Sequence, residues 1–128
     1  MSPDYAREWV RKAEADRVAA KRALKDSRKR KDQAEIACFH AQQCVEKYLK
    51  ALLSWHGYAT PKIHDLLALA QTLKKAKYPV TRAEKDLRML NQYAVEIRYP
   101  GSSATPAQAG QAVRAMEKTV HLVSSKIR

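Results

Sequence analysis

Apolar residues recur along this chain at the three- and four-residue spacing of an α-helix, in five stretches separated by polar or turn-forming residues. We predict helices over about residues 3–29, 33–56, 64–75, 82–98 and 106–127. No segment alternates between apolar and polar residues over a useful length, so the pattern indicates an all-α fold. The two longest apolar stripes are Ala37, Ala41, Cys44, Tyr48, Leu52 and Trp55, and Ala109, Val113, Met116, Val120, Val123 and Ile127.

Capping residues mark where these helices begin and end. Ser2 followed by Pro3 is typical of a helix start. Three further starts resemble capping boxes, in which a side-chain oxygen accepts a hydrogen bond from a helix N–H; they are Asp32–Glu35, Thr81–Glu84 and Thr105–Gln108. Gly57 is placed to end the second helix, because glycine readily adopts the left-handed conformation found at helix C-termini.

The length and the order of the helices predict a simple architecture. The chain has 128 residues, which is the size of one domain, so we expect residues 1–128 to form a single unit. We expect an antiparallel four-helix up-and-down bundle, with the short helix over 64–75 as an additional element in the second connection. The helix over 33–56 should be central, because apolar residues cover more than half of its circumference.

Positive charge strongly exceeds negative charge, with 25 Lys and Arg against 13 Asp and Glu and a formal net charge of +12. The excess is concentrated between Arg7 and Lys31, and this region ends in the run RKRK at residues 28–31. Such an excess favours a polyanionic partner, namely RNA, DNA, a nucleotide or an acidic protein. A solvated helix face that only keeps the protein in solution would have the same pattern, so both interpretations stay open.

The cysteines and the apolar runs bear on location and on metal binding. Cys38 and Cys44 lie on one predicted helix, about 9 Å apart along its axis, so they cannot bridge each other, and unpaired thiols are typical of a reducing cytoplasm. There is no run of 18 apolar residues and the N-terminus is charged from Asp4, so we expect neither a membrane span nor a signal peptide. His40 and Cys44 have no further ligands, so we expect no metal and no cofactor.

Three stretches together are similar to a known family. They are CFHAQQCVEKYLKALLSWHG at residues 38–57, KIHDLLALAQTL at 62–73 and YAVEIRYPG at 93–101. In this order, and over about residues 4–126, the chain resembles the HEPN domain family, whose name abbreviates a nucleotide-binding domain of higher eukaryotes and prokaryotes. The resemblance implies an all-α bundle that forms homodimers and binds a nucleotide or RNA. It also implies a minimal nucleotidyltransferase as partner, in a two-protein module of toxin–antitoxin type.

Other branches of the HEPN family are metal-independent ribonucleases, and this resemblance implies the alternative function, an endoribonuclease toxin. Such an enzyme needs a histidine that moves protons and a cation that stabilises charge on the phosphorane, and the family places its Arg and His with four to six residues between them. No histidine falls in that window after Arg98. Arg114 and His121 have the right spacing, but they lie in the last predicted helix and are only weak catalytic candidates.

The end of the fourth predicted helix is one candidate ligand site. Pro100 steers the residue before it out of the α conformation, so the helix should stop near Arg98 and Tyr99. Arg98 either complements the carbonyl end of the helix dipole or binds a phosphate, with Tyr99 stacking on a base. These structural and functional interpretations both remain open.

The second predicted helix has the other candidate site. Gln43, Lys47 and Lys50 form one stripe, beside the adjacent pair Gln42 and Glu46. The stripe is either an exposed face with an ordinary Glu46–Lys50 ion pair or a polar binding site within the bundle.

His64 is the last candidate for ligand binding. It precedes Asp65 at the start of the predicted short helix. There the imidazole either caps a helix end or contributes to a site.

Overall fold

The computed structural model describes residues 3–94 and 99–127, and every regular element in these ranges is helical. The α-helices are α1 (Pro3–Asp26), α2 (Gln33–Trp55), α3 (Leu66–Lys75), α4 (Glu84–Leu90) and α5 (Pro106–Ser124). Two short 3-10 helices flank α4, η1 at Thr81–Ala83 and η2 at Asn91–Tyr93. The prediction of an all-α fold is confirmed.

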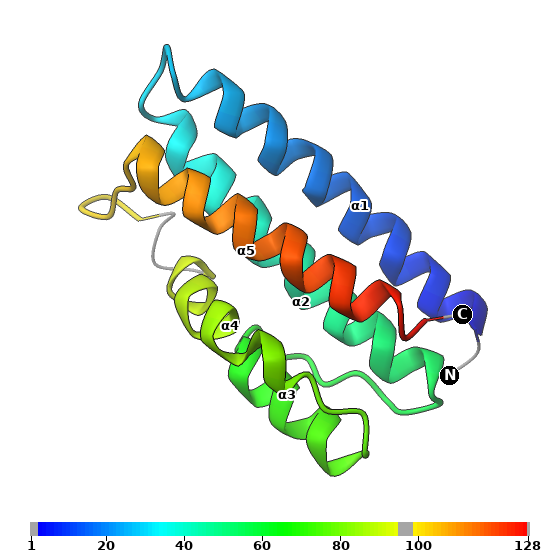
Figure 1. Ribbon diagram of the computed structural model, residues 1–128. Coiled ribbons are helices and arrows are strands. Elements are labelled where there is room, and N and C mark those ends of the chain that lie inside the picture. The colour runs from blue at the N-terminus through cyan, green and yellow to red at the C-terminus, as the bar shows by residue number, and fades with distance from the viewer. Residues whose placement is uncertain (1–2, 95–98, 128) are drawn as a thin grey trace.

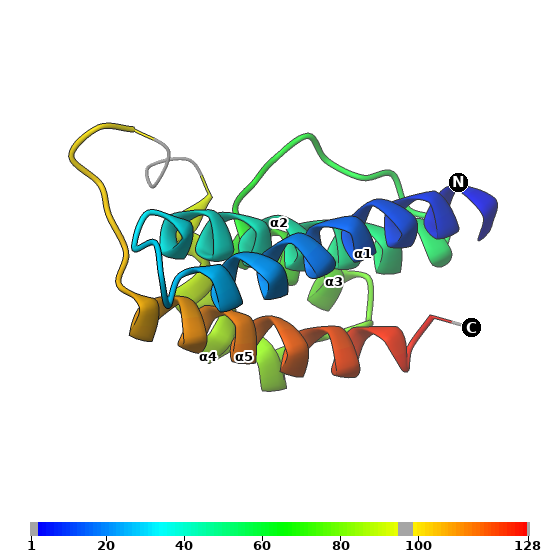
Figure 2. The same ribbon diagram turned by 90° about the horizontal axis from the view of Figure 1, so that it is seen from above.

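The helices pack around a central pair. α2 and α5 lie side by side, with α1 along one side of the pair and α3 and α4 along the other (Figure 1). In chain order α1, α2, α4 and α5 alternate in direction, as in an up-and-down bundle, and α3 occupies the connection between α2 and α4 (Figure 1). α1 begins at the end of the molecule where α2 and α5 end (Figure 2). α2 contacts α1, α3, α4 and α5, which is the central position that its apolar circumference predicts.

Small side chains allow α1 and α2 to pack closely. Ala6, Ala13 and Ala20 repeat every seven residues along α1, which brings them to one face of the helix, and all three are fully buried. The large buried side chains come from the other helices: Leu49, Leu52, Leu53, Leu66, Leu69, Leu73, Leu87, Leu90 and Met116. Each such side chain contributes about 1.5–3 kcal/mol through its removal from water.

Of the predicted capping boxes that can be compared with the structure, one is confirmed and two are wrong. The Thr105 hydroxyl accepts a hydrogen bond from the Gln108 N–H, and the Gln108 side chain accepts one from the Thr105 N–H. Asp32 makes no cap bond, because its backbone is already helical and its carboxylate accepts a hydrogen bond from Arg30. Thr81 lies inside η1, and neither η1 nor α4 has a side-chain cap. The predicted start at Ser2 lies outside the described residues.

The predicted end of α2 at Gly57 is supported in detail. Gly57 has φ +84°, the left-handed conformation that glycine adopts without strain. The Tyr58 N–H donates to the Leu53 carbonyl at 3.0 Å and the Gly57 N–H donates to that of Ser54 at 3.0 Å. This is the Schellman pattern, in which the chain after the helix satisfies its last carbonyl groups.

The fourth predicted helix is shorter and less regular than its sequence pattern suggests. Instead of one helix over 82–98, the chain forms η1, the seven-residue α4 and η2, and the predicted end at Arg98 lies outside the described residues. Asn91 gives a physical reason for the change at Leu90, since its side chain accepts a hydrogen bond from the Leu66 N–H and donates one to Asp65. This pairing joins the end of α4 to the start of α3.

Candidate functional site

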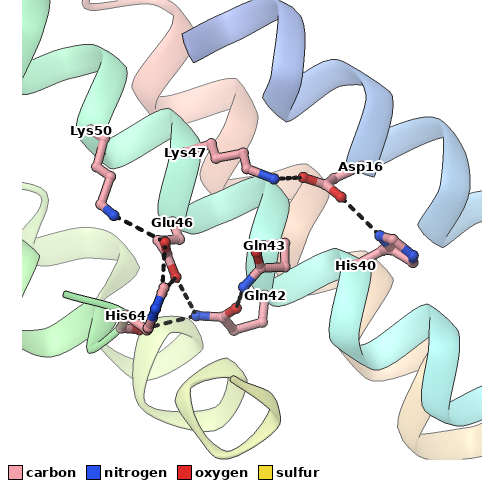
Figure 3. Close-up of polar contacts among 8 residues, drawn as sticks. All are labelled: Asp16, His40, Gln42, Gln43, Glu46, Lys47, Lys50 and His64. Atoms are coloured by element: carbon pink, nitrogen blue, oxygen red, sulfur yellow. Dashed lines mark hydrogen bonds and ion pairs between the residues drawn. The ribbon is translucent and has the colours of Figure 1, made fainter. Parts of the chain in front are cut away.

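The polar side chains predicted on α2 belong to two neighbouring groups of ion pairs. Lys50 and His64 contact the carboxylate of Glu46, while Lys47 contacts Asp16 of α1 (Figure 3). Gln43 donates to the side chain of Gln42, at 2.7 Å. The structure therefore brings Gln43, Lys47, Lys50 and His64 to one region, where α2 lies between α1 and the segment that leads into α3.

Glu46 is at the centre of the first group. Its Oε2 lies 3.1 Å from Nζ of Lys50, and both of its carboxylate oxygens lie 3.1 Å from Nδ1 of His64. Gln42 donates to Oε1 of Glu46 at 3.3 Å and to the backbone carbonyl of His64 at 3.1 Å. Glu46 and Lys50 are only 3% and 5% exposed, so the interpretation of this pair as an ordinary surface ion pair is wrong. It is a buried pair, held by contacts from the chain before α3.

Asp16 is at the centre of the second group and joins α1 to α2. It accepts hydrogen bonds from Lys47 Nζ and, at 2.8 Å, from Nδ1 of His40. Burial raises the pKa of Asp16, but the hydrogen bonds from His40 and Lys47 and their charges outweigh this and hold that pKa below its ordinary value. Asp16 is therefore a charged anchor that positions Lys47 at the surface between the two helices.

His64 does not cap α3. Asp65 does so, since its Oδ1 accepts hydrogen bonds from the N–H groups of Leu67 at 2.9 Å and Ala68 at 3.2 Å. The Ala68 N–H and the Asn91 side chain together lower the pKa of Asp65. The side chain of His64 is 61% exposed while its Nδ1 faces the buried Glu46, so the imidazole links the internal ion pair to solvent.

Arg114 and His121 are both exposed on α5, and no hydrogen bond or ion pair joins them in the part of the chain that the structure describes. Arg114 lines a hollow of about 310 Å³ together with Lys85 and Gln111, and His121 lines an adjoining hollow of about 380 Å³, since Asp86 and Lys118 line both. The guanidinium of Arg114 lies back over Gly110, where an added Cβ would come within 3.3 Å of Nη1. That contact directs the cation toward the start of α5 and away from His121.

The predicted site around Arg98 and Tyr99 is described only in part. Arg98 lies outside the described residues. Tyr99 is 62% exposed, and the turn after it is closed by a hydrogen bond from the Ser102 N–H to the Tyr99 carbonyl, at 3.2 Å. The phenol ring is therefore accessible at the surface before α5, where stacking on a base is sterically open.

The basic run identified in the sequence forms the turn between α1 and α2. A hollow of about 580 Å³ is lined there by Lys25, Asp26, Arg28, Lys29, Arg30 and Gln33. Among the described residues, Lys25, Arg28, Lys29 and Lys31 take part in no ion pair. Backbone hydrogen bonds hold the turn, including those from the N–H groups of Lys29 and Arg30 to the Asp26 carbonyl, each 3.0 Å long. The cations are thus presented on a rigid support.

Sequence reasoning missed the part that α1 contributes near α2. Asp16, His40 and the rings of Tyr5 and Trp9 were not expected to lie beside Lys47, yet a hollow is lined by Tyr5, Trp9 and Lys47. A weak signal was present, because Tyr5, Trp9, Lys12 and Asp16 follow helical spacing on one face of α1.

The cysteines offer no reactive thiolate. Both are free and fully buried. Burial raises the pKa of Cys38 to about 11 and raises that of Cys44 further. The described residues contain no group of three or more His, Cys, Asp and Glu side chains placed to bind a metal ion. Within the same ranges, every helix is too short or too polar to cross a bilayer.

Comparison with known proteins identifies the family. The model of the HEPN domain matches residues 6–126, so the chain belongs to the HEPN domain family. One similar solved structure is TT1696 from Thermus thermophilus, with a TM-score of 0.80 and 24% identity over 94% of this chain and 97% of that one. Another is ST0689, an archaeal HEPN homologue, with a TM-score of 0.74 and 22% identity over 96% of this chain and 98% of that one. No curated protein sequence matches the chain.

Proposed function

We propose that this HEPN domain is a nucleotide- or RNA-binding and partner-binding module that acts without turnover. The observation that carries the proposal is the basic turn between α1 and α2. Within the described ranges, Lys25, Arg28, Lys29 and Lys31 have no acidic partner there, whereas Lys47 and Lys50 on α2 are each paired with one carboxylate. Unpaired cations on a rigid turn bind phosphates at a smaller entropic cost than cations on a mobile segment.

Membership of the HEPN family supports a protein partner as well. We propose that the domain forms a homodimer and pairs with a minimal nucleotidyltransferase, in a toxin–antitoxin-type module in the cytoplasm. Arg98 and Tyr99 remain predicted ligand contacts, together with Gln43, Lys47, Lys50 and His64. Of the α2 group, Lys47 and His64 are the members with accessible side chains, at 23% and 61% exposure.

The alternative, a metal-independent endoribonuclease, has less support. It needs an arginine and a histidine that reach the same phosphate, whereas the guanidinium of Arg114 lies over Gly110, toward the start of α5 and away from His121. The exposed imidazole of His64 is bound to the carboxylate of Glu46, and none of its hydrogen-bonding partners among the described residues is an arginine.

The direct experiment separates binding from cleavage. A short single-stranded RNA, ATP and GTP are titrated into the protein at about 50 mM salt, and the RNA is then incubated with the protein in EDTA. We expect saturable binding of at least one of them and intact RNA. Cleavage of the RNA in EDTA that is lost in both Arg114→Ala and His121→Ala would contradict the proposal and establish the ribonuclease. If none of the three ligands binds, the proposal is also contradicted, and the excess positive charge has no role in binding them.

A further inference from the structure

A hollow between α1 and α2 combines two aromatic rings with two lysines. It has a volume of about 440 Å³ and is lined by Tyr5, Glu8, Trp9, Lys12 and Lys47. Small-molecule sites commonly have volumes of roughly 300–1,000 Å³, and they combine an apolar wall with a few polar groups. The aromatic rings can stack on a planar base and the ammonium groups can bind an anion, so the lining is complementary to a molecule that contains both.

The aromatic wall has the geometry of a corner. The rings of Tyr5 and Trp9 have centroids 6.4 Å apart and an interplanar angle of 82°, so one ring presents a face where the other presents an edge. Nζ of Lys50 lies 5.4 Å from the centroid of the Trp9 ring and stabilises the ring's position. Nε1 of Trp9 is buried and has no hydrogen-bond acceptor among the described residues.

The charge of the hollow favours an anion. Lys12 is exposed and takes part in no ion pair within the described ranges, and Lys47 is held in place by Asp16 while keeping 23% of its side chain exposed. Glu8, the acid in the lining, is bound by Arg11. The unpaired Lys12 and the Asp16-bound Lys47 therefore both line the hollow, and the carboxylate in its described lining, that of Glu8, is already bound by Arg11. A phosphate group is a suitable ligand for such a pair.

We propose that this hollow binds a mononucleotide, with the base against Tyr5 and Trp9 and the phosphate at Lys12 and Lys47. The proposal rests on the proposed function and deepens it, since it separates a nucleotide site from the basic turn that binds the RNA backbone. Trp9 and Lys25 are sixteen residues apart on α1, about 24 Å along the helix axis. The two sites can therefore be changed independently.

Trp9 itself supplies the readout. The chain has two tryptophans, so Trp55→Phe leaves Trp9 as the sole tryptophan fluorophore. Titration of AMP into this variant is expected to change the Trp9 emission saturably, and calorimetry on the wild-type protein should give the same affinity. Adenosine should bind more weakly than AMP, and ribose 5-phosphate, which has no base to stack, should leave the emission unchanged.

Charge reversal distinguishes the phosphate contact from a general effect of charge. Lys12→Glu should lower the affinity for AMP roughly tenfold and leave that for adenosine unchanged. Lys75→Glu makes the same change of net charge at an exposed position on α3, outside the lining of this hollow, and should leave AMP binding unchanged.

Three results would overturn the inference. They are the absence of any AMP response up to about 1 mM in both measurements, equal effects of the two charge reversals, and an emission change that follows protein concentration alone. The last result would assign the hollow to contact with a second copy of the chain. If the protein binds RNA but not AMP, the proposed function stands and only the nucleotide site is rejected. If it binds neither RNA nor AMP, both the proposed function and the nucleotide site are rejected.

Discussion

Nζ of Lys50 lies 3.1 Å from Oε2 of Glu46, and both side chains are almost fully buried. A charge that is removed from water is costly unless its partner is present, so each member of this pair depends on the other. The pair also connects the two parts of the site. Lys50 lies over the ring of Trp9 on one side, and Glu46 binds the exposed imidazole of His64 on the other.

The first prediction concerns this dependence. Glu46→Gln leaves the Lys50 ammonium buried without a counter-charge, and we expect it to lower the free energy of unfolding by about 3 kcal/mol. Lys50→Met, which keeps the length of the side chain, should also destabilise the protein. The double variant should lose clearly less than the sum of the two single variants, because no unpaired charge is created. Urea unfolding of all four proteins measures this coupling, and strictly additive losses would contradict it.

The second prediction concerns acid stability. The folded-state pKa of Asp16 is lowered, so this carboxylate stabilises the fold above the ordinary aspartate range, and its contribution disappears as pH falls through the folded-state value. At pH 7, Asp16→Asn should be less stable than wild type by about 2 kcal/mol, because one of the two oxygens that accept from His40 and Lys47 becomes an NH2 donor and the negative charge between them is lost. We expect the difference to shrink below about pH 4. Thermal unfolding between pH 7 and pH 3 tests this, and a difference that does not change with pH would count against it.

The third prediction compares two threonines that the sequence presents as equivalent. Thr105→Ala removes a capping box and should lower the free energy of unfolding by about 1 kcal/mol. Thr81→Ala is the matched control, because Thr81 makes no cap bond, and it should change stability by less than about 0.5 kcal/mol. Denaturant titrations of both variants give the comparison, and equal losses would show that Thr81 caps a helix in solution.

The two threonines also illustrate which parts of the fold the sequence predicts. Helix periodicity located α1, α2, α3 and α5 to within a few residues, because apolar spacing is a local property of the chain. The capping pattern failed at Asp32, whose backbone is already helical, and at Thr81, which lies inside η1. Arg30, close in sequence, takes the carboxylate of Asp32, and Asn91, distant in sequence, connects the end of α4 to α3.

The candidate site could be predicted only in part for a similar reason. Spacing on α2 predicts one stripe of Gln43, Lys47 and Lys50, whereas in the structure Lys47 binds Asp16 and Lys50 binds Glu46, in two neighbouring groups (Figure 3). Their partners Asp16 and His64 come from other elements, and a single sequence does not specify how α1 and the segment before α3 align with α2. The Glu46–Lys50 pair is buried because of that alignment. The interpretation of the pair as exposed was therefore wrong, since tertiary packing and not local spacing determines its burial.

The measurement that tests the central claim most directly is the salt dependence of RNA binding. Removing one phosphate-binding cation should reduce the slope of log K against log salt by about 0.7 for a single strand, so replacing Lys25, Arg28 and Lys29 by Gln should reduce it by about 2. The matched control replaces Lys74, Lys75 and Lys77, three exposed lysines at the end of α3, and should keep the wild-type slope. A reduced slope in the turn variant alone is the predicted result. The same slope in all three proteins would contradict the account.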